Sequence, residues 1–437
     1  MQLPNNAATN GWYNVLPDPA PAKQVSGTIR APYVVLGAGV TGLSAARQLA
    51  THLPDEEIVL IEAERIGFGT SGRNSGGALA SFFHGDEPLN NPELSAAHAR
   101  LCTGGLNILR KLVKENEIEC GWHDWGKLHV SAGAEGDASI NGLVQGYETL
   151  GIEAKELNAD EVAAVTGSTF YTAGLKVEAT GLMNPAAMCR GLGETLPSNV
   201  TLYENTPVHR LERGQPSRLI TAHGEVIADH LIMCTNVFSP ALGFSKSDMV
   251  PVVAYASLTR PMTALEPAEI GGDANGFGLL PAAHGGSTVR RTPEGRILMR
   301  NSFGYGPGDT SNTDMLARAR ANHIESIKKR WPKLQDFEMG LEIEHTWGGV
   351  LGVTRNTGHV FGQLEKGIWG SIGCNGANVA RGTMSGALIA DMIVGNTSDL
   401  LSDQQSVPRP KWLPPDPFRK MGARHRMKKM DKASAER

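Results

Sequence analysis

The chain has 437 residues, of which 41% are hydrophobic and 20% charged. This excludes a largely disordered protein and predicts two structural units, because a single core stops growing at roughly 250–300 residues. The formal net charge of −4 gives no basic field for nucleic acid, and no uncharged apolar run reaches the roughly 18 residues of a membrane span. The five cysteines are scattered without a CxxC pair, which indicates a reducing, cytoplasmic compartment and neither a disulfide framework nor a metal site.

Residues 33–62 carry the order strand, glycine turn, helix, strand. The run YVVL and the later run IVLIE are rich in β-formers, and TGLSAARQLA between them has a helical composition. Gly37, Gly39 and Gly42 form a GxGxxG pattern at the first strand-to-helix turn, and Glu62 ends the second strand. The helix N-terminus can then bind a pyrophosphate, while the carboxylate accepts hydrogen bonds from ribose hydroxyls and repels the 2′-phosphate of NADP. This pattern predicts a site for FAD or NAD.

Helix and strand patterns alternate through the rest of the chain. We expect helices at 92–117, 136–150, 158–165, from 184, at 314–330 and at 383–395, and strands at 127–130, 200–211 and 231–235. Alternating segments over 250–305 predict a mostly antiparallel sheet, with Pro293-Glu294-Gly295 as a hairpin turn. The basic segment RKMGARHRMKKMDK near the C-terminus is expected to be a solvated helix, a subunit contact or a site for an anionic partner.

The segment ERIGFGTSGRNSGG, which begins at Glu64, two residues after Glu62, decides between NAD and FAD. Its closely spaced glycines allow the backbone to run against a flat or phosphorylated ligand, and Arg73 and Asn74 can hydrogen-bond that ligand. These residues resemble the glycine and D-amino-acid oxidase superfamily. The similarity is greatest to its γ-glutamylputrescine oxidoreductase-like branch, whose members carry a similar GFGxSGRNGG segment. The resemblance implies an FAD-dependent oxidoreductase.

Three later stretches extend the resemblance to about residues 30–395. Val208 lies where relatives touch the adenine with main-chain atoms. LIMCTNVFSP is similar to the second nucleotide motif, with Asn236 where Gly is more usual. WGGVLGVTRNTGHVFG and GIWGSIGCNGANVARG resemble the segment along the pyrimidine edge of the flavin. Relatives often show GHG where this chain has Asn375-Gly376-Ala377-Asn378, so a histidine role in that loop is not carried over.

The resemblance implies bound FAD without a covalent tether, because segment 350–362 lacks the cysteine that tethers FAD in sarcosine-oxidase relatives, and Cys374 is expected to pack in the loop. The residues expected to bind FAD are Gly37, Gly39, Val40, Thr41, Gly42, Glu62, Ala63, Gly69, Thr70, Ser71, Arg73, Asn74, Ser75, Gly76, Val208, Thr235, Asn236, Gly373, Asn375, Gly376, Ala377, Asn378 and Val379.

The expected fold is α/β, with a Rossmann-type FAD-binding domain and an interleaved α+β substrate domain that contains a mostly antiparallel sheet. We assign the FAD-binding domain to 30–120, 183–245 and 341–400, and the substrate domain to 121–182 and 246–340. Residues 1–29 would form an arm that either covers a cleft or hangs loose, and 401–437 a Pro-rich linker with a basic tail.

Substrate groups are expected on the second domain. Arg291 and Arg300 on the predicted hairpin can clamp an anionic end of a substrate, although both also suit surface positions. His84, His345 and Trp347 are placed near the expected flavin face, where structural roles remain open for the histidines. We thus predict His84, Arg300, Trp347 and Asn375 as catalytic, and Arg291, Arg300 and His345 as substrate-binding.

The predicted reaction is oxidation of a small amine or amino acid by hydride transfer to flavin N5, giving an imine that hydrolyses. O2, with release of H2O2, or another acceptor would reoxidise the flavin. No lysine in strand 296–305 matches the oxygen-activating lysine of some relatives, so oxidase and dehydrogenase both stay open. A homodimer is possible. The alternatives are a flavin monooxygenase, which usually needs an Asp that GSIGCNGANVARG lacks, and a flavin-binding subunit of a larger complex.

Overall fold

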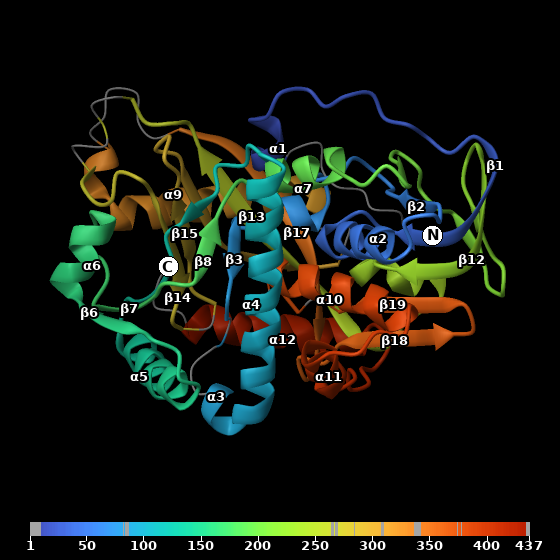
Figure 1. The fold of residues 1–437 in the computed structure, drawn as a ribbon. Helices are drawn as coiled ribbons and strands as arrows, with labels where there is room; N and C mark the ends of the chain where they lie inside the picture. The colour runs from blue at the N-terminus through green and yellow to red at the C-terminus, as the bar shows by residue number, and fades with distance from the viewer. Residues whose placement is uncertain are drawn as a thin grey trace.

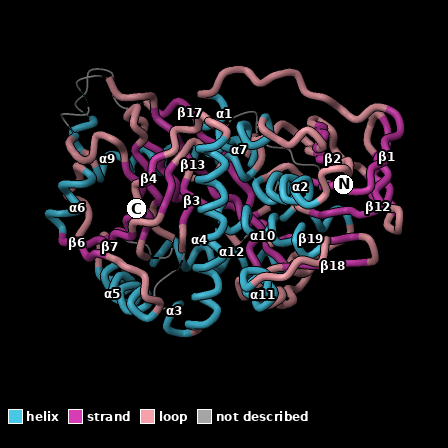
Figure 2. Tube along the Cα trace, viewed as in Figure 1, coloured by secondary structure: helices cyan, strands magenta, loops and turns pink. Residues whose placement is uncertain are grey.

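The computed structural model describes residues 10–81, 83, 87–263, 266, 270–283, 285–306, 310–335, 342–373, 375–376 and 378–433. The long helix α4 (Pro92–Glu115) crosses the middle of the molecule, with β1, β2 and β12 on one side of it and α5, α6 and α9 on the other (Figure 1). The same view coloured by secondary structure shows strands on both sides of this helix (Figure 2). No described helix is long and apolar enough to cross a membrane.

The first sheet is built around parallel strands. Its order is β10-β11-β12-β1-β2-β9, and β19 pairs with both β12 and β18. The strands are β1 (Gly27–Leu36), β2 (Ile58–Ile61), β9 (Val200–Tyr203), β10 (Arg210–Glu212), β11 (Ser217–Ile220), β12 (Gly224–Met233), β18 (Val360–Glu365) and β19 (Ile368–Ile372). All four residues of β2 are buried, as expected of a central parallel strand covered on both faces.

The second sheet is antiparallel except for the β14–β5 pair. Its order is β17-β13-β16-β15-β14-β5-β7-β6. The strands are β5 (Lys127–Ser131), β6 (Lys155–Asn158), β7 (Ala173–Val177), β13 (Met249–Thr259), β14 (Phe277–Pro281), β15 (Thr288–Arg291), β16 (Ile297–Tyr305) and β17 (Ile343–Thr354). This mixed architecture confirms the predicted fold class.

A small sheet, β3-β8-β4, lies beside α4. It consists of β3 (Gly77–Leu79), β4 (His123–Asp124) and β8 (Thr180–Leu182). The remaining elements are α1 (Gly11–Asn14), α2 (Val40–His52), η1 (Thr70–Gly72), α3 (Glu87–Asn90), α5 (Ala134–Thr149), α6 (Ala159–Thr166), α7 (Pro185–Glu194), η2 (Asn236–Leu242), α9 (Thr313–Arg330), η4 (Pro332–Gln335), α10 (Asn378–Ile393), α11 (Asp399–Ser406) and α12 (Phe418–Ala433).

Strand β17 departs from the domain assignment made from the sequence. We placed 341–400 in the FAD-binding domain, yet β17 pairs with β13 in the second sheet from Met249↔Thr354 onward. Its glycines explain the ambiguity, because they let one strand touch both units. A Cβ on Gly349 would lie 3.3 Å from the Arg73 Cβ, and one on Gly352 would lie 2.8 Å from the Asn236 Oδ1. Strand β17 therefore forms a shared wall between the two sheets.

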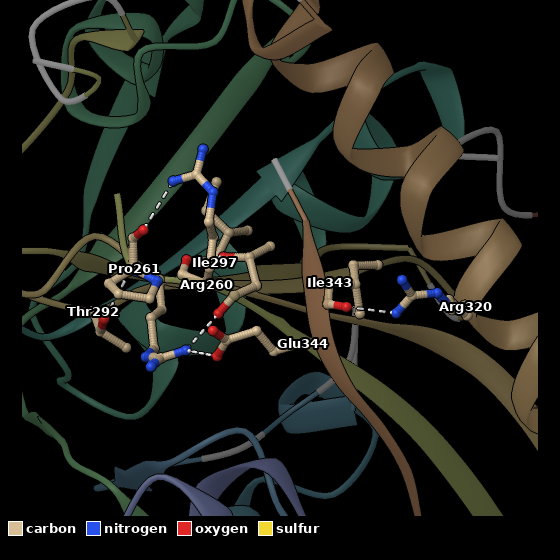
Figure 3. Close-up of polar contacts among 9 residues, drawn as sticks. Arg260, Pro261, Thr292, Ile297, Arg320, Ile343 and Glu344 are labelled. Atoms are coloured by element: carbon tan, nitrogen blue, oxygen red, sulfur yellow. Dashed lines mark hydrogen bonds and ion pairs between the residues drawn. The ribbon is translucent and has the colours of Figure 1, made fainter. Parts of the chain in front are cut away.

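One ion pair and hydrogen bonds to backbone carbonyls link the end of β13 to the starts of β16 and β17 (Figure 3). Arg296 donates to the Thr259 carbonyl at 2.8 Å and to the Glu344 carboxylate. Arg320 of α9 donates to the Ile343 carbonyl at 2.6 Å. The second sheet is thereby braced against α9 at the end of these strands.

A nearby buried ion pair predicts acid-sensitive stability. The Glu266 carboxylate accepts hydrogen bonds from two guanidinium nitrogens of Arg260 and from the Thr263 N–H. The Glu266 side chain is only 9% exposed and the Arg260 side chain 10%. The Arg260 hydrogen bonds lower the pKa of Glu266 to about 2 from its ordinary 4.5. Since the folded pKa is the lower one, this stabilisation is complete above about pH 4.5 and disappears as the pH falls towards 2.

We expect Glu266→Gln to lower the free energy of unfolding by about 3 kcal/mol at pH 7, because the buried Arg260 loses the carboxylate that accepts its charged hydrogen bonds. Urea denaturation at several pH values should show the difference from wild type shrinking below pH 4.5. Glu115→Gln, which removes an exposed pair with Lys111, is the control and should change stability by less than about 1 kcal/mol. Equal losses in the two variants would refute a special role for Glu266.

Candidate active site

A cavity of about 1330 Å³ lies between the two sheets. One part of its wall is the turn between β1 and α2, and another is formed by β14, β15 and β16 of the second sheet. Strand β17 contributes Gly349, Leu351 and Val353, and α12 contributes Phe418 and Arg426. The cavity therefore joins the expected nucleotide site to the expected substrate side in one space.

The glycine turn is shaped as a cradle that side chains would fill. Gly37 has a φ of +100°, and a Cβ there would lie 2.8 Å from the Cys234 carbonyl oxygen. A Cβ on Gly42 would lie 1.8 Å from the Gly37 carbonyl oxygen, so no side chain fits between helix and turn. A Cβ on Gly39 would approach the Ser71 hydroxyl, which itself accepts the Val40 N–H at 3.0 Å. Such a turn at a helix N-terminus fits a pyrophosphate.

Glu62 is fixed beside this turn. Its carboxylate accepts the backbone N–H of Ala38 at 2.9 Å and that of Glu64 at 3.1 Å, and it lines the cavity. Burial raises the pKa of Glu62, and the two backbone N–H donors oppose that shift. The carboxylate is thus oriented at the end of β2, where a ribose would be recognised.

The glycine-rich loop after Glu62 is held by its own polar side chains. Arg73 donates to the Phe68 carbonyl at 2.6 Å and to the Gly348 carbonyl at 3.1 Å, and burial lowers its pKa to about 10. Asn74 donates to the Ser71 carbonyl and accepts the Gly76 N–H. Both residues line the cavity, but these contacts show that they also shape the loop.

The N-terminal arm supports the same loop, a role that the sequence left open. Asn10 donates to the carbonyls of Gly67 and Gly72, and the Trp12 indole donates to the Asn74 carbonyl at 2.8 Å. Trp12 is 2% exposed. Residues 10–16 of the arm are therefore packed against the body of the protein, whereas most residues from 17 to 24 are exposed.

Two asparagines tie together the loops at the opposite end of the nucleotide site. Asn236, where Gly was the usual residue, adopts a φ of +42°, which Asn tolerates, and its Oδ1 accepts the Gly373 N–H at 3.2 Å. Asn375 has a φ of +52°. Its Oδ1 accepts the N–H and hydroxyl of Thr354, and its Nδ2 donates to the carbonyls of Gly358 and Gly373.

We expect Asn375→Ala to weaken FAD binding about tenfold or more, because it removes these bonds and leaves an alanine in left-handed backbone. Asn375→Gly should bind FAD more tightly than the alanine variant but less tightly than wild type, since glycine relieves only the backbone strain. Titration of each apoprotein with FAD, followed by flavin fluorescence, measures both. Wild-type affinity in the two variants would contradict this role for the loop.

The substrate side of the cavity carries positive charge. Arg300 lines the wall, donates to the Thr288 hydroxyl and lies 5.3 Å from the centre of the Phe303 ring. Arg290 lines it too, donates to the carbonyls of Gly76 and Met183, and has its pKa lowered to about 10 by burial. Lys127, 1% exposed, also lines the cavity and donates to the carbonyl and hydroxyl of Ser81.

Three residues predicted for the substrate site do not line the cavity. Arg291 donates to the Gly271 carbonyl, because alternate residues of a strand point to opposite faces and its neighbour Arg290 takes the cavity side. Trp347 is fully buried and donates to the Arg73 carbonyl at 3.0 Å. Both Trp347 and His345 lie directly against Gly11 of α1, so the arm covers this part of β17. The structure thus does not bring these three residues to the cavity wall.

The cavity collects most of the predicted FAD-binding residues. Those that line it are Gly37, Gly39, Val40, Thr41, Glu62, Ala63, Gly69, Thr70, Ser71, Arg73, Asn74, Ser75, Val208, Thr235, Asn236, Gly373, Asn375, Gly376 and Val379. Gly42 and Gly76 pack behind the wall, and Asn378 begins α10. The predicted residues His84 and Ala377, and Cys374 with its expected packing, lie outside the described residues. The sequence did not predict that Lys127, Arg290 and α12 line the cavity, or that Trp12 supports the glycine-rich loop.

A family described as FAD dependent oxidoreductase matches residues 32–392. The gamma-glutamylputrescine oxidoreductase of Escherichia coli is 26% identical over 86% of this chain and 87% of its own length. A probable oxidoreductase OrdL of Haemophilus influenzae is 26% identical over 84% and 83%. The crystal structure of glycine oxidase from Bacillus cereus, 16% identical, superposes with a TM-score of 0.69 over 88% of this chain and 100% of that one. The last likeness shows a shared fold alone.

Proposed function

The chain belongs to the FAD dependent oxidoreductase family, and from this premise we propose that it oxidises the C–N bond of a small amine or amino acid. One observation supports this most strongly: a single cavity is lined both by the glycine turn and by the cationic wall of the second sheet. The similarity to a gamma-glutamylputrescine oxidoreductase over 86% of this chain points to the same type of bond.

The residues of the first sheet would hold FAD. Backbone N–H groups at the start of α2 would bind the pyrophosphate, Glu62 the ribose, and the main chain at Val208 the adenine. The loops of Asn236 and Asn375 would face the other end of the cofactor. When bound, FAD supplies the acceptor for a hydride that leaves the carbon next to nitrogen.

The second sheet would position the substrate. Arg300 would bind an anionic end of the substrate by charge-assisted hydrogen bonds. Arg290 and Lys127 add positive charge, which lowers the pKa of an ammonium group nearby and favours the neutral amine that can be oxidised. Apolar wall residues, among them Leu279 and Phe303, would exclude water from the reacting carbon.

The overall reaction balances as a two-electron oxidation. The amine loses two electrons and two protons to become an imine, which water splits into an aldehyde or oxo acid and an amine or ammonia. We propose O2 as the acceptor of the electrons, reduced to H2O2. Every residue invoked belongs to one chain, so the proposed reaction does not depend on the homodimer that the sequence left open.

Product analysis tests this proposal. Aerobic incubation with γ-glutamylputrescine, an N-methyl amino acid, glycine or a D-amino acid should yield one carbonyl product and one H2O2 per amine consumed. A carbonyl product without H2O2 would replace O2 by another acceptor. If no amine gives a carbonyl product and the protein instead consumes added NADPH, a flavin monooxygenase is favoured.

A further inference from the structure

The C-terminal part of the chain exposes large apolar side chains. We call residues 411–428 the C-terminal surface. Among the described residues, the large hydrophobic side chains with the greatest exposure are Phe418 at 67%, Met421 at 65% and Trp412 at 64%, and all three belong to it. Contiguous exposed apolar side chains mark contact sites. These three lie within ten residues of one another in the sequence.

The same surface is strongly basic. Residues 411–428 contain six Lys or Arg and only one Asp, although the whole chain has a formal net charge of −4. Lys411, Arg424, Arg426 and Lys428 are exposed, and none of them forms an ion pair with another residue that the structure describes. Their charge is therefore not neutralised within the described structure.

The C-terminal surface is fixed to the body of the protein. The Leu413 N–H bonds to the Ser247 carbonyl at 2.8 Å, and the Tyr305 hydroxyl donates to Asp416 at 2.7 Å. Arg419 donates to the Lys246 carbonyl at 3.0 Å. These contacts hold Trp412, before α12, and Phe418, at its start, in place before any partner binds, which reduces the entropy lost on binding.

We propose that the C-terminal surface docks the protein on a bilayer of anionic phospholipid. Cations are attracted to such a surface without needing a fixed partner geometry, and aromatic side chains insert at the headgroup level. A protein partner would instead require a packed apolar centre with a polar rim. Here the apolar side chains are interspersed with unpaired cations, so the lipid surface fits better.

Docking in this way would also affect the cavity. Phe418, Gly422 and Arg426 of α12 line it as well as belonging to the C-terminal surface. The bilayer would then lie against the helix that closes this side of the cavity. The family match ends at residue 392, so this arrangement lies in a part of the chain outside it.

Vesicle co-sedimentation of the full-length holoprotein tests the proposal. The protein should sediment with vesicles of phosphatidylcholine containing phosphatidylglycerol, should not sediment with phosphatidylcholine alone, and should be released by high salt. We expect the double variants Arg424→Glu/Lys428→Glu and Trp412→Ala/Phe418→Ala each to reduce vesicle partitioning about tenfold or more. Circular dichroism and thermal melting verify that the variants remain folded, because replacing Phe418 in the cavity wall can change the flavin content by itself.

A matched charge reversal on the exposed end of α4, Lys111→Glu/Lys114→Glu, is the control and should bind vesicles like wild type. Binding that is independent of phosphatidylglycerol, or lost equally in the control, would overturn the proposal. It would also be overturned if the C-terminal variants left vesicle binding unchanged but altered the sedimentation coefficient, since a second copy of the chain would then be the partner.

Discussion

Gly42→Val should produce a protein that purifies without flavin and binds added FAD at least about 100-fold more weakly than wild type. The reason is steric, because a Cβ at this position would lie 1.8 Å from the Gly37 carbonyl oxygen. Helix α2 must then move away from the turn that would bind the pyrophosphate. Overpacking of this kind also costs about 1–3 kcal/mol of stability. The flavin-to-protein absorbance ratio and an FAD titration measure the effect.

Thr51→Ala is the matched control, because Thr51 is exposed in the last turn of the same helix. It should retain a full complement of FAD. A yellow Gly42→Val protein with wild-type affinity would contradict the assignment of this turn to the cofactor, whereas loss of FAD from both variants would show only that α2 is fragile.

Arg300→Met should raise the KM for an anionic amine by about 10–100-fold while changing kcat little. Arg300 lines the cavity on the second sheet, and a guanidinium bonded to a carboxylate contributes about 1.5–3 kcal/mol. If Arg300 binds the substrate anion equally strongly in the ground state and in the transition state, its removal raises KM and leaves kcat unchanged. Steady-state kinetics normalised to flavin content, with a matched uncharged amine as a second substrate, gives this separation.

Arg291→Met tests the specificity of that effect. Arg291 lies nine residues earlier in the same hairpin but donates to the Gly271 carbonyl and does not line the cavity. We expect a lower melting temperature and an unchanged KM. An equal rise in KM for both variants would mean that the effect reflects general damage to the sheet, and a larger rise for Arg291→Met would restore its predicted role.

Local patterns identified the nucleotide half of the molecule well. The GxGxxG turn, Glu62 and the glycine-rich loop lie close together in the sequence, so their spacing already determines most of their geometry. Helices expected at 92–117 and 314–330 are present as Pro92–Glu115 and Thr313–Arg330. Their long amphipathic periods make such helices easy to recognise.

The substrate half depended on contacts that sequence spacing does not show. Arg290 and Arg291 are adjacent, and only the pairing of β15 with β14 and β16 decides which of them faces the cavity. Trp347 lies on β17 with the cavity-lining residues, but α1 from the far end of the chain covers it. The placement of α12 in the cavity wall likewise depends on long-range contacts with Ser247 and Tyr305.

Asn236 shows how a departure from the family pattern can be explained. Its left-handed backbone meets the requirement that usually selects glycine, and its side chain adds a bond to Gly373 that glycine cannot make. Sequence comparison alone marked this position as a departure. The structure explains it as a link between two loops of the same site.

Anaerobic mixing of the purified protein with a panel of amines, followed by flavin absorbance, tests the central claim most directly. We expect at least one amine or amino acid to bleach the flavin band, and we expect Arg300→Met to require higher concentrations of the same amine for bleaching. Bleaching only by NADPH, or only by a substrate without a C–N bond such as a 2-hydroxy acid, would contradict it.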